Sequence, residues 1–171
     1  MKRRARRARF DREPNSFKIA WFPWITVMLA AMVPILPFVV IAPISPPWGF
    51  MLFLAWRLIQ REVWYPWAGA ALGFYDDMWS GQPLGSSILI WSLTLFALDL
   101  VDRRMLWRDY WQDWALGTIG CVLALSAELW IANQTGGHTR VIHIIPQIAF
   151  SILVFPLVMR LCARADQWRF S

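Results

Sequence analysis

The sequence predicts an all-α integral membrane protein, a bundle of six transmembrane helices whose second and third spans are short. Composition is the first reason: 58% of the 171 residues are apolar and 16% are charged, whereas about 25% of the residues in a soluble domain are charged. Clustering is the second reason, because the apolar residues form blocks. Those at 19–41 and 141–161 are long enough to cross a bilayer. Both observations disfavour an ordinary water-soluble enzyme.

The first element is a basic tail at 1–18, in which seven of the first twelve residues are Lys or Arg. A basic run alone would also suit nucleic acid, but this one directly precedes a long apolar segment. It is therefore interpreted as a topology determinant that contacts anionic lipid, with no nucleic-acid partner. A cleaved signal peptide is the alternative. The apolar stretch is longer than a signal-peptide core and no clear cleavage site follows, so an uncleaved signal anchor is expected.

Six spans follow from the apolar blocks. They are placed at 19–41, 47–59, 66–79, 87–101, 114–132 and 141–162, with a short tail at 163–171. The second and third contain about 13 and 14 residues, or roughly 20 Å of helix, against a hydrocarbon core of about 30 Å. A re-entrant hairpin is the alternative for this pair. It would hold Arg57, Arg61 and Glu62 at mid-membrane depth, at a free-energy cost of about 2.5–3.5 kcal/mol per basic residue. Two spans whose connecting loop lies in the cytoplasm are therefore preferred.

Basic residues indicate how the bundle is oriented. With both termini in the cytoplasm, 16 of the 17 Lys and Arg residues fall on the inner side and only Arg140 lies outside, as the positive-inside rule requires. Trp residues mark both interfaces, with Trp48, Trp79, Trp91 and Trp130 toward the outer one. The inner segment 102–114 is expected to lie flat on the cytoplasmic surface, because its aromatic residues share one helical face. The sequence therefore predicts a multi-pass protein of a bacterial plasma membrane.

The end of the third span is the most unusual stretch, because Asp76 and Asp77 lie deep in the membrane just before a helix break at 80–85. Three interpretations compete. A broken helix with carboxylates suits transport of a cation or cationic solute, whereas a catalytic pair would need a nucleophile or metal and the sequence has no HExxH, GxSxG or Cys/His cluster. The third interpretation is structural: Asp77 hydrogen-bonds exposed backbone N–H groups and holds a kinked hairpin in shape. Of the three interpretations, the structural one is preferred.

Other polar residues in the spans carry weaker signals. Glu128 lies in the outer third of the fifth span and is costly there unless it is paired, for which His143 is the candidate. Asp99 and Arg103 are four residues apart and would form an ion pair within one helix. Cys121 and Cys162 lie in separate apolar blocks and suggest no disulfide or metal framework. No catalytic, cofactor-binding or metal-binding residue is predicted.

The motif around the break resembles a known family. Small residues from Gly69 onward are followed by Gly73-x3-Asp77-x2-Ser80-Gly81-x-Pro83-Leu84-Gly85, which is similar to the G-x3-D-x2-SG-x-PLG signature of MreD, the rod shape-determining inner-membrane protein. Length and layout of the spans are also similar. The chain departs from the family in Asp76, which doubles the single acid, and in its strongly basic tail.

The resemblance implies a function and a fold. It implies a non-enzymatic partner of MreC in the machinery for lateral peptidoglycan synthesis, and through MreC a connection to MreB, RodA and a class B transpeptidase. It also implies a six-helix fold like that of the substrate-binding subunits of energy-coupling-factor transporters. Helix faces recognise other spans by packing and polar contacts, and Trp48, Trp79 and Trp91 mark the expected partner face.

A solute-binding membrane subunit is the competing hypothesis. It predicts a solvent-connected pocket lined by Asp76, Asp77 or Glu128, whereas a scaffold predicts a filled core at this place.

Overall fold

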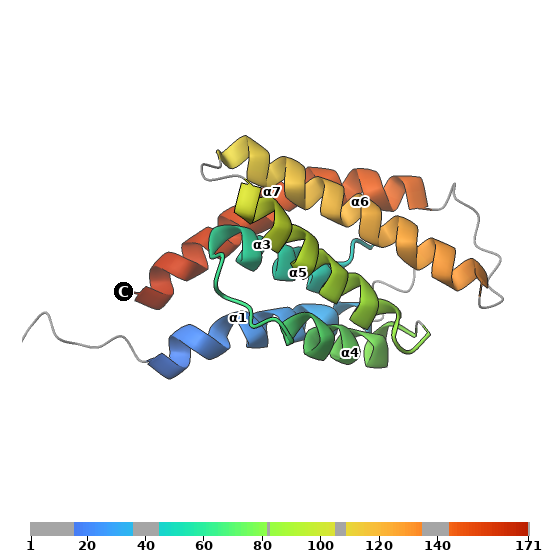
Figure 1. Cartoon of the computed structure of the whole chain (residues 1–171), viewed down its shortest axis with the longest axis horizontal. Helices are drawn as coiled ribbons and strands as arrows, with labels where there is room; N and C mark the ends of the chain where they lie inside the picture. The colour runs from blue at the N-terminus through green and yellow to red at the C-terminus, as the bar shows by residue number, and fades with distance from the viewer. Residues whose placement is uncertain (1–15, 36–44, 82, 105–108, 135–143, 171) are drawn as a thin grey trace, which may run out of the picture.

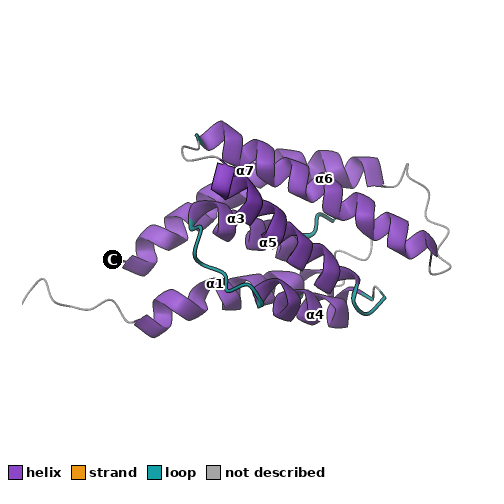
Figure 2. Cartoon of the chain, in the orientation of Figure 1, coloured by secondary structure: helices purple, strands orange, loops and turns teal. Residues whose placement is uncertain are grey.

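Six α-helices make up most of the computed structural model, which describes residues 16–35, 45–81, 83–104, 109–134 and 144–170 (Figure 1). The helices are α1 (Ser16–Ala31), α3 (Trp48–Ile59), α4 (Ala68–Ser80), α5 (Ser86–Arg104), α6 (Tyr110–Gln134) and α7 (Ile144–Phe170), with a 3-10 turn, η2 (Val33–Ile35), after α1. Figure 2 shows only helices and loops across these described ranges. The all-α class is confirmed, and each of the six predicted spans contains one helix.

Helix lengths divide the bundle into two groups. By length and composition, two helices, Tyr110–Gln134 and Ile144–Trp168, could cross a membrane, while the apolar segments Trp21–Ile35 and Trp48–Ile59 are shorter. The second and third predicted spans are short as expected, because α3 has 12 residues and α4 has 13. That all six helices cross the membrane stays a prediction.

The shortest helix, α3, forms the centre of the bundle. Nine of its 12 residues are buried, and it packs against α1, α6 and α7. A helix that is apolar on every side requires protein or lipid all around it, and here the neighbouring helices supply that cover. Phe50, Phe53 and Trp56 are its largest fully buried side chains, and the indole N–H of Trp64 donates to the carbonyl of Phe53 at 3.1 Å.

Contacts between distant segments define two ends of the bundle. At one end the rings of Phe22 and Trp168 lie 6.2 Å apart, and Gln60 donates to Asp166 at 3.1 Å. At the other end Gln147 donates to the carbonyl of Ser45 at 2.8 Å. These contacts show that α1 runs opposite to α3 and α7, and Figure 1 shows that successive helices alternate in direction. In the described ranges the Lys and Arg residues belong to the first end, which we call the basic end: Lys18, Arg57, Arg61, Arg103, Arg104, Arg160, Arg164 and Arg169.

Two boundaries differ from the prediction. α7 continues to Phe170, where the sequence suggested a tail from 163, because hydropathy marks the apolar part of a helix and not its end. The inner segment 102–114, expected to lie flat on the surface, is not one helix, because residues 102–104 belong to α5 and 110–114 to α6; residues 105–108 lie outside the described residues. Residues 1–15, most of the predicted basic tail, lie outside the described residues.

Candidate functional site

Two glycines on one face of α4 allow α5 to approach closely. A Cβ atom added at Gly69 would lie 2.9 Å from the Cα of Ser92, and one added at Gly73 would lie 2.6 Å from the carbonyl oxygen of Ser87. Both separations are too short for non-bonded atoms, and both involve backbone that cannot rotate away. The small-residue pattern therefore produces a tightly packed helical hairpin, as small residues do where membrane helices meet.

Asp77 ties the last turn of α4 to the first turn of α5. Its carboxylate accepts the backbone N–H of Gly85 at 2.7 Å, the backbone N–H of Ser87 at 2.9 Å and the hydroxyl of Ser86 at 3.2 Å. The side chain is buried. Because the first N–H groups of a helix have no partner within it, this carboxylate acts as the N-terminal cap of α5, where the helix dipole also favours negative charge.

The loop between α4 and α5 uses the remaining glycines of the motif. Gly81 ends α4 with φ 67° and Gly85 has φ 102°, a left-handed region that residues with a Cβ rarely adopt. The carbonyl of Pro83 accepts the backbone N–H of Ser86 at 3.1 Å and its hydroxyl at 2.9 Å. Leu84 is 77% exposed, so packing within the chain does not explain its place in the motif.

A small cavity with both apolar and polar residues in its wall lies beside this hairpin, at the end opposite the basic end. It has a volume of about 190 Å³, and its polar lining comes from Ser45, Asp76, Ser80, Ser87, Glu128 and Gln147. The hydroxyl of Ser87 donates to Asp76 at 3.0 Å, so Asp76 is joined to the same first turn of α5 as Asp77. Asp77 does not line the cavity. The two residues thus have separate places, Asp77 in the hairpin and Asp76 at the cavity wall.

Several residues predicted for the site have a different setting. Trp91 is 1% exposed, in the core against Phe50 and Phe53, so its assignment to a partner face is wrong. The hydropathy of α5 does not reveal which of its sides faces inward. Trp79 is 40% exposed and Trp48 is half-buried. His143, the expected partner of Glu128, lies outside the described residues.

A charge cluster around the buried Arg57 at the basic end is the main feature that the sequence did not reveal. Arg57 of α3 is buried and pairs with Asp99 and with Asp102, the latter at 2.9 Å, while Arg61 lies 3.9 Å from Asp102. The predicted pair within α5 is wrong, because Asp99 pairs with Arg57 instead of Arg103. An i, i+4 spacing shows only pairs within one helix, and this contact joins residues 42 apart.

The hydrogen bonds of Asp77, the close approach at Gly73 and the ion pairs of Arg57 each join two helices, so they are suited to holding the bundle together. Among the described residues, no group of three or more His, Cys, Asp or Glu side chains could hold a metal ion. Cys121 and Cys162 are both buried as free thiols.

The comparisons with known proteins come from sequence and from structure. A model of the family described as rod shape-determining protein MreD matches residues 15–165, a range that includes the hairpin, the cavity and most of α7. No curated protein and no solved structure matches the chain. The expected likeness to energy-coupling-factor subunits therefore stays a prediction.

Proposed function

The chain belongs to the MreD family of rod shape-determining membrane proteins, and from this membership we propose that it is a non-enzymatic scaffold of the cell-wall elongation machinery in the bacterial inner membrane. Its direct partner would be MreC. Through MreC it would connect to MreB, RodA and a class B transpeptidase, and its basic tail would contact anionic lipid.

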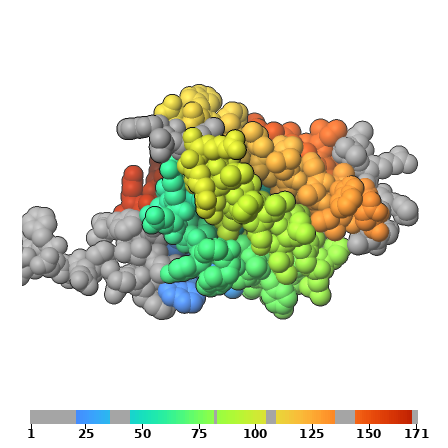
Figure 3. All heavy atoms as spheres, in the orientation of Figure 1, coloured from blue at the N-terminus to red at the C-terminus, as the bar shows by residue number. Residues whose placement is uncertain are grey.

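An exposed apolar stripe on α5 supports this proposal. Leu89, Leu93, Phe96 and Leu100 are 48–68% exposed, and their spacing of four, three and four residues places them on one side of the helix. Figure 3 shows α5, in yellow-green, along the surface of the face turned toward the viewer. A partner helix recognises such a stripe by packing side chains against it.

The α4–α5 hairpin would present this stripe in a fixed orientation. Phe74, Met78 and Trp79 of α4 are exposed as well, and the capping bonds of Asp77 with the close approach at Gly73 fix α4 relative to α5. A surface that is ordered before binding loses less entropy on association. The family motif would then serve partner binding indirectly, by holding the hairpin that carries the stripe. Exposed Leu84 in the loop would add a contact at the outer end.

Orientation is part of the proposal. The gathering of the described Lys and Arg residues at one end supports a cytoplasmic location for that end and for both termini. The Gly81–Gly85 loop would then face the periplasm.

A deletion strain tests the functional assignment. Loss of the protein is expected to turn a rod-shaped Gram-negative host round or lethally swollen, and a plasmid copy should restore rods. The purified protein should show neither hydrolase nor transferase activity on peptidoglycan precursors. Unchanged rods in the deletion strain, with MreC retained and no second copy of the gene, would contradict the assignment.

A solute-binding subunit remains the second candidate, and the cavity beside the hairpin is the observation in its favour. The cavity is lined by Asp76 and Glu128, two of the residues that this hypothesis named. Thermal unfolding of the detergent-solubilised protein with Mg²⁺ or tetramethylammonium tests it. Saturable stabilisation that is lost in Glu128→Gln would favour this function, and no stabilisation would favour the scaffold.

A further inference from the structure

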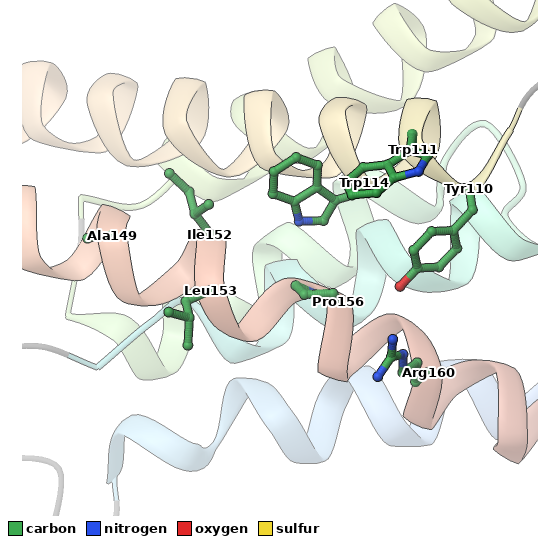
Figure 4. Close-up of a pocket in the computed structure, with 8 residues that line it drawn as sticks. All are labelled: Tyr110, Trp111, Trp114, Ala149, Ile152, Leu153, Pro156 and Arg160. Carbon is green, nitrogen blue, oxygen red and sulfur yellow. The ribbon is translucent and has the colours of Figure 1, made fainter.

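An open groove runs between the first turns of α6 and the middle of α7 (Figure 4). Its volume is about 660 Å³. Tyr110, Trp111 and Trp114 of α6 form one wall, and α7 forms the other from Ala149 to Arg160. Pro156, inside α7, lies in this second wall. The lining is therefore aromatic and aliphatic, with one cation.

That cation lies at one end of the groove. Figure 4 shows Arg160 and the hydroxyl of Tyr110 at the same end, with Ala149 at the other. Arg160 is exposed, and in the described ranges no carboxylate forms an ion pair with it. Arg160 also belongs to the basic end of the bundle, together with Arg164 one turn later. A guanidinium beside an apolar groove at the membrane interface is stabilised by an anionic partner.

Charge and shape together define the occupant. Ala149 and Arg160 are 11 residues apart, which is about 16 Å along α7. A helix about 10 Å across would occupy roughly 1,250 Å³ over that length, about twice the groove's volume, so a helix could sit only partly in this open groove, whereas a narrower apolar chain can lie wholly inside it. Arginine binds phosphate through two parallel hydrogen bonds. We propose that this groove binds an anionic phospholipid, with an acyl chain along α7 toward Ala149 and the phosphate at Arg160 and Tyr110.

The site differs from the lipid contact expected at the basic tail. The tail would attract anionic headgroups by charge alone, whereas the groove selects a phosphate and an acyl chain at a fixed separation. A probe without an acyl chain, or a protein without Arg160, should therefore show weaker binding at the groove. Binding of anionic headgroups at the tail should be unchanged.

Native mass spectrometry of the full-length protein tests the proposal with three probes: dioleoylphosphatidylglycerol, dioleoylphosphatidylcholine and glycerol 3-phosphate. We expect saturable binding of the first probe, weaker binding of the second and none of the third. Arg160→Gln keeps an N–H donor but loses the charge and the second hydrogen bond, so it should weaken phosphatidylglycerol binding about tenfold. Arg104→Gln is the matched control, since it removes an exposed arginine at the same end, outside the groove, and should leave binding unchanged.

The apolar half of the groove has its own pair of variants. Ala149→Trp should block it and weaken binding of both phospholipids, whereas Leu157→Trp, on an exposed side of α7 outside the lining, should not. A photoactivatable phosphatidylglycerol should cross-link wild-type protein within α6 and α7. Equal losses in Arg160→Gln and Arg104→Gln, or wild-type binding by Ala149→Trp, would overturn the proposal. Cross-linking of Leu153 to a partner's transmembrane helix in place of lipid would overturn it as well.

Discussion

The carboxylate of Asp77 accepts the backbone N–H of Ser87 at 2.9 Å, so the end of α4 caps the start of α5. The carboxylate also accepts the N–H of Gly85, the residue just before α5, so both bonds are formed by main-chain groups at the start of the following helix. They therefore depend on the position of the backbone, and an acceptor at residue 77 controls the geometry of the whole hairpin.

Replacing Asp77 should show how much its hydrogen bonds to the backbone stabilise the hairpin. Asp77→Leu leaves two N–H groups without their acceptor, an expected cost of about 1–3 kcal/mol. Asp77→Asn keeps one oxygen acceptor and should cost less. Thermal unfolding in detergent measures both against Glu62→Gln, which changes an exposed acid and should have little effect. Normal abundance and rod shape with Asp77→Leu would refute the capping role.

Adding a methyl group at Gly73 should push α4 and α5 apart. The new Cβ would lie 2.6 Å from the carbonyl oxygen of Ser87, and overpacking of this kind costs about 1–3 kcal/mol. The exposed neighbour Ala71 offers a control, since Ala71→Ser should change stability by about 0.5 kcal/mol at most. Equal stability of Gly73→Ala and Ala71→Ser would show that the helices do not pack as closely as described.

Breaking the charge cluster at the basic end should destabilise the bundle. Arg57→Leu removes the cation that pairs with Asp99 and Asp102, and breaking a buried pair costs about 3–5 kcal/mol. We expect the low end of that range, because the Asp99 side chain is 55% exposed. Asp102→Asn in the same chain should recover part of the loss, whereas Arg104→Gln should be neutral. Additive losses in the double variant, measured by chemical unfolding, would argue against coupling.

Membrane orientation can be measured by labelling single cysteines in a background without Cys121 and Cys162. Cysteines at Arg104 and near the C-terminus should react only after the membrane is permeabilised, whereas one at Gly81 should react from the periplasm. The reason is the concentration of basic residues at one end of the bundle. Labelling near Arg61 from the periplasm would contradict the six-span arrangement.

The helices and the hairpin were predictable from the sequence because their signals are local. Apolar blocks mark each helix, and the break after Ser80 with its glycines predicts a capped turn in which Asp77 has donors to bind. The rotation of each helix about its axis is not local. The positions of the Trp residues therefore predict an outward-facing Trp91, although α5 turns it into the core. The contact of Arg57 with Asp102 joins two helices that no spacing rule connects.

Site-specific photo-cross-linking in living cells tests the proposed scaffold most directly. A photoreactive amino acid at Leu93 or Phe96, on the exposed stripe of α5, should cross-link to MreC. The same residue at Leu123 of α6 or Leu157 of α7, which are equally apolar and exposed, should give little product. We expect this difference in variants that still support rod shape. Equal yields from all four positions, or no MreC product from α5, would contradict it.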